Sequence, residues 1–131
     1  AFSDIDTLGH LDYIARYGKR YAQKYTNEDA SLKYSDFKNE IDAIFDFIIK
    51  KGIALEINTG NIGYGYSEPN PSYEIIKAYY DMKGRKITLG ADAHKKENVG
   101  IGFDKVCDKL KCLGIKSYMC FKNRKGYEVL L

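Results

Sequence analysis

The sequence predicts an α/β fold whose strands form a mostly parallel sheet. Apolar runs of strand length alternate with longer segments in which apolar residues recur at helical spacing, a pattern typical of strand–helix–strand units. The length of 131 residues fits one domain with a single core. About five strands are predicted, whereas a closed barrel normally needs about eight strands and ~250 residues. We therefore expect the chain to form half of a larger structure.

The chain opens with an apolar run at residues 5–8, which we expect to be an interior strand. Because no methionine precedes it, the N-terminus is expected to be missing. Residues 13–18 are predicted to form a short helix that Gly18 ends. Tyrosines recur every four residues from here on, and because Gly18 interrupts the series we interpret them as packing residues beside a mobile connection: Tyr13, Tyr17, Tyr21 and Tyr25.

A second helix is predicted to be capped by Ser35 or Asp36 and to end before Gly52. Its apolar residues share one face: Phe37, Ile41, Ile44, Phe45 and Ile48. The next strand is expected at 53–58, followed by a polar, glycine-rich loop over 59–70. Alternation along this strand predicts two faces, one with Ala54, Glu56 and Asn58, the other with Ile53, Leu55 and Ile57.

Pro71 is expected at the first position of a third helix, where proline is favoured, and Gly84 marks the end of that helix. Its apolar residues are Tyr73, Ile76 and Tyr80. The run 86–89 is predicted to be a strand, and 103–113 an amphipathic helix that Gly114 stops. Two short strands are expected to close the chain, at 117–121 and 127–131.

Composition excludes several classes of partner. The net charge of +3 is small, so charge does not indicate a nucleic-acid partner. We interpret the basic cluster 122–125 as a solvated hairpin turn. No apolar run approaches membrane-spanning length, and no signal-peptide pattern is present. Three cysteines without Cys-x-x-Cys spacing predict reduced, mostly buried thiols in a cytoplasmic protein: Cys107, Cys112 and Cys120.

The two histidines of the chain each follow a strand-like run, beside a glycine and two residues from an aspartate. His10 precedes Asp12, and Asp92 precedes His94. Because side chains alternate along extended backbone, Asp92 and His94 are expected on one side, where they offer an oxygen and a nitrogen ligand to a divalent metal. Alternatively, both histidines merely cap strand ends in polar loops.

Three segments resemble motifs of histidinol-phosphatases in the polymerase-and-histidinol-phosphatase (PHP) superfamily. Residues 6–13 with 16–18 are similar to the third motif of that family, and 55–59 to its Glu-Ile-Asn-Thr strand. Residues 90–95 with 98–100 resemble its fourth motif, usually Gly-Ser-Asp-Ala-His. The resemblance runs over the whole chain but covers only the C-terminal half of such an enzyme, because the family's first motif, His-x-His, is absent.

The resemblance implies that residues 1–131 are the C-terminal part of a single PHP-type metallophosphatase domain. That domain is a distorted (β/α)7 barrel similar to a TIM barrel, so an N-terminal half of the same barrel is an expected partner. About two or three divalent metal ions are implied at the C-terminal ends of the strands, with zinc, manganese and iron all suited to imidazole and carboxylate. The implied activity is hydrolysis of L-histidinol phosphate to L-histidinol and phosphate, in histidine biosynthesis.

By the same resemblance, His10, Asp92 and His94 are the expected metal ligands and catalytic residues. Asp12 can orient His10 or accept a proton, and it can equally cap the helix that follows. Both interpretations stay open. Glu56 is expected deeper in the barrel, in a structural role.

Three residues are candidates for binding the small phosphorylated substrate. Arg16 suits a phosphate clamp, since a guanidinium binds phosphate oxygens in pairs, although it can also be an exposed helix arginine. Asn58 is expected near the functional end of its strand, and Lys95 is a weaker candidate. The family's loop after the Glu-Ile-Asn-Thr strand often carries an arginine, and the corresponding loop 60–66 has none.

Other functions remain open beside the phosphatase. The altered loop 60–66 keeps another small phosphate ester possible as the substrate, and a non-catalytic PHP module is the alternative from a different class. A degenerate or truncated product without activity is a third possibility. The isolated chain is expected to be catalytically silent, and to aggregate or dimerise through an unpaired strand edge beside residues 5–8.

Overall fold

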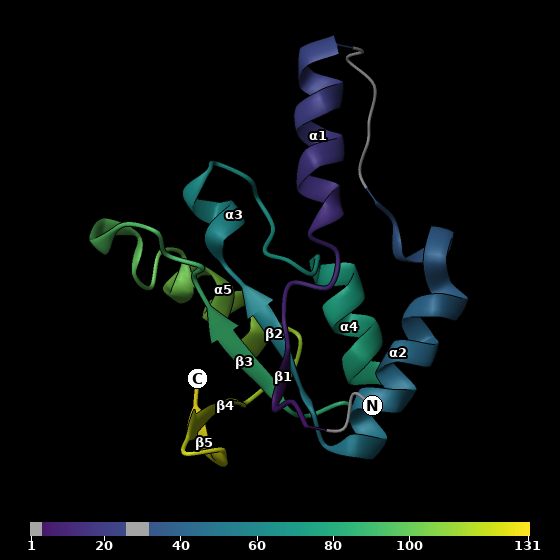
Figure 1. Cartoon of the computed structure of the whole chain (residues 1–131), viewed down its shortest axis with the longest axis vertical. Helices are drawn as coiled ribbons and strands as arrows, with labels where there is room; N and C mark the ends of the chain where they lie inside the picture. The colour runs from purple at the N-terminus through teal and green to yellow at the C-terminus, as the bar shows by residue number, and fades with distance from the viewer. Residues whose placement is uncertain (1–3, 26–31) are drawn as a thin grey trace.

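Residues 4–25 and 32–131 are described in a computed structural model (Figure 1). Three strands form a parallel sheet in the order β1–β2–β3, namely β1 (Thr7–Leu8), β2 (Ala54–Asn58) and β3 (Ile87–Gly90). The register pairs Leu55 with Leu8 on one side and with Ile87 on the other. The predicted α/β class and parallel pairing are confirmed. Within the described residues these strands do not close into a barrel.

Three helices cover one face of this sheet and form the core with it. They are α2 (Lys38–Lys51), α4 (Tyr73–Asp81) and α5 (Phe103–Cys112). The rings of Phe45 on α2 and Tyr79 on α4 pack edge to face, with centroids 5.2 Å apart. Leu55 and Ile57 point into this core and are fully buried, as the alternation along their strand predicts. Glu56 and its same-face neighbours therefore occupy the opposite face of the sheet.

The end of α2 follows the predicted pattern. Gly52 adopts a left-handed conformation, with φ of 69°, and its N–H bonds back to the carbonyls of Ile48 and Ile49, which favours glycine there. The predicted cap at Ser35 or Asp36 is wrong, because a 3-10 helix, η1 (Tyr34–Phe37), precedes α2 and Phe37 takes the N-cap position without a side-chain hydrogen bond. Asp36 instead accepts a hydrogen bond from the Lys33 N–H at 3.3 Å, at the start of η1. Phe37, predicted on the buried face, is exposed.

The helix predicted over 13–18 is longer than expected. Helix α1 (Ile14–Tyr25) passes through Gly18 without a break and extends away from the sheet (Figure 1). The predicted end was wrong because a glycine inside a helix costs only about 1 kcal/mol, and buried Arg16 and Ala22 fix the helix on either side of it. The interpretation of the tyrosines as packing residues is also wrong, since three of them are exposed: Tyr17, Tyr21 and Tyr25.

The segment between β2 and α4 contains a short helix that the loop prediction missed, α3 (Gly60–Gly63). Helix α4 begins at Tyr73, two residues after Pro71, with Ser72 at its N-cap position. Its buried residues are Ile75, Ile76 and Tyr79, so only Ile76 of the three predicted apolar positions is fully buried. A second 3-10 helix, η2 (Lys96–Asn98), follows β3.

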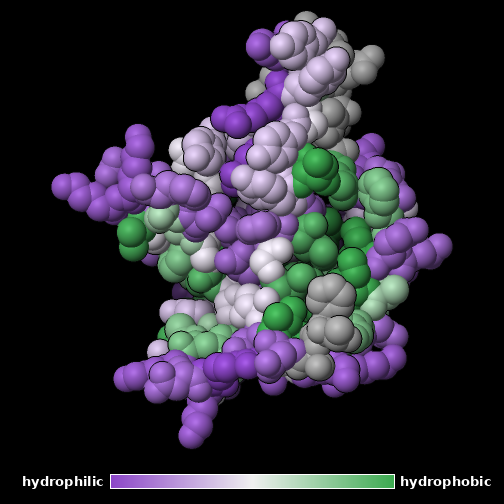
Figure 2. Space-filling model, in the orientation of Figure 1, coloured by the Kyte–Doolittle hydropathy of each residue, from purple (hydrophilic) through white to green (hydrophobic). Residues whose placement is uncertain are grey.

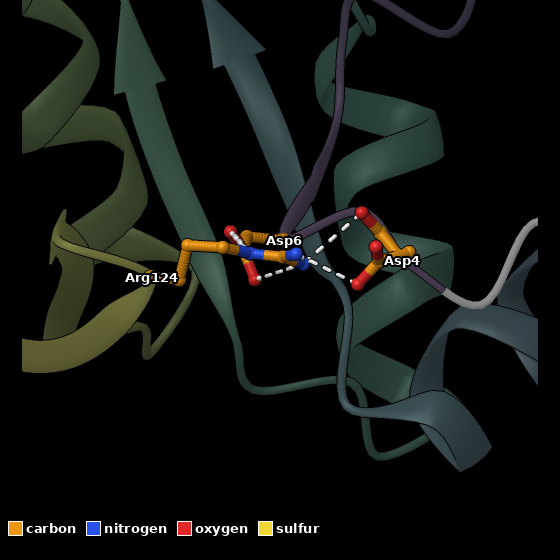
Figure 3. A network of polar contacts seen from close by, with 3 residues as sticks. All are labelled: Asp4, Asp6 and Arg124. Atoms are coloured by element: carbon orange, nitrogen blue, oxygen red, sulfur yellow. Dashed lines mark hydrogen bonds and ion pairs between the residues drawn. The ribbon is translucent and has the colours of Figure 1, made fainter.

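The chain closes with an antiparallel hairpin of β4 (Ser117–Lys122) and β5 (Lys125–Leu130), with β4 beside β3. Its two-residue turn has positive φ at both Asn123 and Arg124, which matches the twist of a hairpin. The predicted turn is confirmed. Its arginine is not merely solvated, because Arg124 pairs with Asp4 at 2.7 Å and with Asp6 at 3.1 Å, joining the hairpin to the start of β1 (Figure 3).

Helix length and cysteine exposure can be compared with the expectations from composition. Among the described residues, no helix combines the length and the apolar character that crossing a bilayer requires. The three cysteines are free, but the expectation that they are mostly buried is wrong. Cys112 is exposed at the end of α5, whereas Cys107 and Cys120 are half-buried.

Candidate functional site

The predicted site residues lie at one edge of the sheet. His10 follows β1, Asn58 ends β2, and Asp92 follows β3. Because the three strands are parallel and adjacent, their C-terminal ends meet at the same edge, which is where sites of α/β proteins are built. The predicted convergence of these strand ends at one edge of the sheet is therefore confirmed.

A cavity of about 220 Å³ opens at this edge. Helix α1 supplies one wall, α3 and the residues after it supply another, and the segment after β3 supplies a third. The side chains that matter for its chemistry are Tyr13, Arg16, Arg20, Tyr64, Asp92 and His94. Positive groups from α1 and the carboxylate–imidazole pair from the end of β3 thus line the same space.

Arg16 is 7% exposed, so it is not an exposed helix arginine. Its Nε–H donates to Asn61 Oδ1 at 2.7 Å, and its Nη1 donates to the Tyr13 hydroxyl at 3.1 Å. Its guanidinium carbon lies 4.5 Å from the centre of the Tyr13 ring and 5.3 Å from that of Tyr64. No carboxylate among the described residues forms an ion pair with it. The guanidinium is fixed in place by hydrogen bonds to neutral groups, and no ion pair with a carboxylate of residues 4–25 or 32–131 neutralises its charge.

Arg20 also lines the cavity, and sequence reasoning missed it. It lies one helical turn after Arg16 on α1, and its guanidinium carbon is 6.0 Å from the centre of the Tyr64 ring. The spacing of four residues from Arg16 is the signal that points to it. That signal was hidden by the expectation that Gly18 ends the helix between the two arginines.

Asp92 and His94 lie in the irregular segment that follows β3. Asp92 has a φ of 47°, and its backbone carbonyl lies 2.7 Å from His94 Nδ1. Because a carbonyl oxygen only accepts hydrogen bonds, Nδ1 carries the proton, and a neutral His94 then has a free lone pair on Nε2. Orienting an imidazole in this way through its second nitrogen is common for metal-binding histidines.

His10 does not line the cavity but borders it. Its ring centroid lies 4.8 Å from that of Tyr13, a residue of the cavity wall. Its backbone N–H donates to Glu56 Oε2 at 3.0 Å. Glu56 is therefore not deep in the fold as expected, because its carboxylate reaches the ends of the neighbouring strands. A Cβ at Gly90 would lie 2.3 Å from Glu56 Oε1, so glycine at this position leaves room for the carboxylate.

Asp12 and Asn58 make internal contacts. The Asp12 carboxylate accepts hydrogen bonds from Asn70 Nδ2 at 2.7 Å and from the Ser72 N–H at 2.9 Å, so it ties the start of α1 to the start of α4. Asn58 is buried, and its Oδ1 accepts from the Gly60 N–H at 2.9 Å. Neither lines the cavity that holds Asp92 and His94.

Curated proteins named histidinol-phosphatase match this chain. It is 41% identical to a probable histidinol-phosphatase of Thermotoga maritima over 125 residues, which are 95% of this chain and 48% of that protein. It is 33% identical to a probable histidinol-phosphatase of Clostridium acetobutylicum, over 76% of this chain and 36% of that protein. A histidinol-phosphatase of Lactococcus lactis is 30% identical over 95% of this chain and 43% of that protein.

The chain belongs to the histidinol-phosphatase family. It spans about half the length of the curated relatives that it matches. No protein-family model matches it.

The ligand chemistry of the site fits a metal in part. Asp92 and His94 offer a carboxylate and an imidazole nitrogen on one cavity, which suit zinc, manganese or iron. Within residues 4–25 and 32–131, however, no three histidine, cysteine, aspartate or glutamate side chains come together as a metal site. Lys95 is exposed at the start of η2 and does not line the cavity. The described residues therefore supply part of a ligand set.

Proposed function

We propose that this chain forms the phosphate-binding wall and part of the metal centre of a phosphomonoester hydrolase. Its substrate is L-histidinol phosphate, which it hydrolyses to L-histidinol and phosphate in histidine biosynthesis. One observation carries this proposal: a buried arginine that forms no ion pair with any carboxylate in the described part of the chain lines the same cavity as Asp92 and His94. The names of the three relatives support the choice of substrate.

Arg16 binds the phosphoryl group in this proposal. Its Nε is occupied by Asn61 and one donor of Nη1 by Tyr13, which leaves the donors of Nη2 for a ligand. Nη2 lies 3.5 Å from the position that a Cβ on Gly60 would take, so a side chain at Gly60 would approach these donors. A planar guanidinium with two parallel donors matches two oxygens of a phosphate.

Asp92 and His94 hold divalent metal in this proposal, through the carboxylate and through Nε2. His10 joins them from the end of β1, where its backbone is anchored to Glu56. Bound divalent metals lower the pKa of a coordinated water to about 7 and neutralise phosphoryl oxygens. The chain's own contribution is to fix these ligands and to hold the substrate phosphate opposite them.

The remaining ligands come from the part of the family's length that this chain does not span. An apolar groove of about 440 Å³ lies between β1 and α2, and Figure 2 shows hydrophobic side chains gathered over this region. It is lined by Ile5, Leu8, Leu11, Ile44 and Phe47, among others. In this sheet β1 is the outer strand, so a preceding strand and helix of a barrel would pack here.

We place the protein in the cytoplasm, where free thiols persist.

The test uses the protein expressed from its complete reading frame. It should release phosphate from L-histidinol phosphate, and a chelator should abolish this activity. Asp92→Ala and His94→Ala should each abolish turnover without lowering the melting temperature, because both side chains are exposed. Arg16→Gln should raise KM. Lys24→Gln is the matched control, an exposed cation on the same helix outside the cavity. Turnover that survives chelation or both site substitutions would rule this function out.

Another small phosphate ester is the second candidate substrate. Loop 60–66 has no arginine, and an exposed tyrosine, Tyr64, lines the cavity from this loop instead. A panel of phosphate monoesters distinguishes the two substrates by kcat/KM. A protein that binds phosphate but hydrolyses no ester would be the non-catalytic module.

A further inference from the structure

Two arginines on successive turns of α1 face one cavity. Arg16 and Arg20 are four residues apart and both line it, so they lie on the same side of the helix. Like charges at this spacing repel each other in a helix. No carboxylate among the described residues forms an ion pair with either of them. This wall of the cavity therefore carries two positive charges that the described residues do not neutralise.

The two guanidiniums are held with different firmness. Arg16 is buried and donates hydrogen bonds to Asn61 and Tyr13. Arg20 is exposed, and its guanidinium carbon lies 6.0 Å from the centre of the Tyr64 ring. The same ring lies 5.3 Å from Arg16. A ring face attracts a cation without neutralising it, so Tyr64 can keep both charges at the cavity while Arg20 stays free to adjust.

We propose that Arg20 is the adjustable second arm of a two-arginine clamp, and that the clamp selects phosphate dianions. This builds on the proposed phosphatase function and adds a binding residue and a class of ligand to it. Arg16 holds the phosphate from the buried side, and Arg20 closes on its outer oxygens. Two positive charges match a phosphomonoester, which carries a charge of about −1.5 to −2 at pH 7. A phosphodiester carries one negative charge and uses only Arg16.

The test measures binding of two probes to the protein expressed from its complete reading frame. Inorganic phosphate is the dianion, and dimethyl phosphate is the tetrahedral monoanion. At pH 8 and 0.15 M salt, Arg20→Gln should weaken phosphate binding about tenfold in calorimetry, as the loss of one charge-assisted contact predicts. Dimethyl phosphate affinity should change less than about twofold. Arg20→Lys should recover part of the loss, because lysine keeps the charge but not the planar fork.

Lys24→Gln is the matched control, since it removes the same charge one turn further along α1, outside the cavity. It should leave both affinities unchanged. If Lys24→Gln weakens phosphate binding as much as Arg20→Gln, the loss reflects the overall positive charge of the protein and not a contact with Arg20. That result would overturn the clamp. If Arg16→Gln weakens phosphate binding and Arg20→Gln does not, the clamp fails while the proposed phosphatase function stands. If the wild-type protein binds no phosphate, both fail.

Discussion

Changing Asn61 to aspartate tests whether Arg16 acts as an anion receptor. Asn61 Oδ1 accepts the hydrogen bond from Arg16 Nε at 2.7 Å in a buried position. Asn61→Asp keeps the size of the side chain and an acceptor oxygen at the same place. It replaces a neutral partner by a negative one, so Arg16 becomes half of an ion pair. Stability and phosphate affinity should then change in opposite directions.

Both effects can be estimated. The Arg16 donor is already charged, so the present hydrogen bond contributes about 1.5–3 kcal/mol. Aspartate adds the attraction of an ion pair, which the cost of burying its carboxylate largely offsets, so the free energy of unfolding should rise by no more than about 1 kcal/mol. A phosphate on the far side of the guanidinium lies about 7 Å from position 61. Repulsion between one charge and a dianion at that distance is about 1 kcal/mol at a dielectric constant of 80 and about 5 at 20. Even the lower figure weakens phosphate binding by about sevenfold.

The assay pairs urea unfolding with calorimetric titration of inorganic phosphate at 0.15 M salt. Lys24→Gln again serves as the control, because it lowers the net charge by the same amount. Its position is eight residues from Arg16, about 12 Å along the helix, which exceeds the Debye length of about 8 Å. A folded Asn61→Asp variant with unchanged phosphate affinity would refute the role of Arg16.

Three further substitutions test other parts of the structure. Gly90→Ala places a Cβ 2.3 Å from Glu56 Oε1, so the carboxylate must move. The free energy of unfolding should fall by about 1–3 kcal/mol, and an unchanged urea midpoint would contradict this. Tyr79→Phe removes a 2.9 Å hydrogen bond to the Lys86 carbonyl and should cost about 1 kcal/mol at pH 7. Burial raises the Tyr79 pKa from 10.0 to about 12, so this tyrosine stabilises the fold below pH 10 and that stability is lost as the pH rises towards 12. Between pH 10 and pH 12 the free energy of unfolding, measured in urea, should fall less for Tyr79→Phe than for the wild-type protein. Parallel pH profiles of the two proteins would exclude the effect. Arg124→Ala breaks exposed ion pairs at the hairpin turn and should lower the free energy of unfolding by less than about 1 kcal/mol, a difference that 1 M salt removes. A larger loss that salt does not change would show that Arg124 does more than pair charges.

Local sequence patterns were enough to predict that the ends of β1, β2 and β3 meet at one edge. His10, Asn58 and Asp92 each stand where an apolar strand run ends, and parallel strands bring such ends together whatever the rest of the fold does. The pattern of Leu55 and Ile57 against Glu56 likewise follows from alternation alone. These predictions succeeded because they depend on chain direction and side-chain period, which are local properties.

Other parts of the site depend on contacts between segments far apart in the sequence. Helix α1 continues through Gly18 because Arg16 and Ala22 are buried against the rest of the protein, and no local signal reports that burial. Arg20 enters the cavity only when this helix is continuous. Glu56 reaches the strand ends because Gly90, on the neighbouring strand, leaves room for its carboxylate. The residue pattern of β2 alone cannot predict the space that a glycine on β3 leaves.

The neutral hydrogen-bond partners of Arg16 are what distinguish a receptor from a structural ion pair. Removing a charged group from water without an oppositely charged partner costs several kcal/mol of folding free energy. Hydrogen bonds to Asn61 and Tyr13 and the faces of two tyrosine rings offset part of that cost. An arginine already paired with a carboxylate would have to give up that pair in order to bind phosphate. The free energy lost with the ion pair would nearly cancel the free energy gained from the phosphate. Because Asn61 orients the guanidinium without neutralising it, the stability forgone in the empty cavity becomes available as binding free energy when a phosphate arrives.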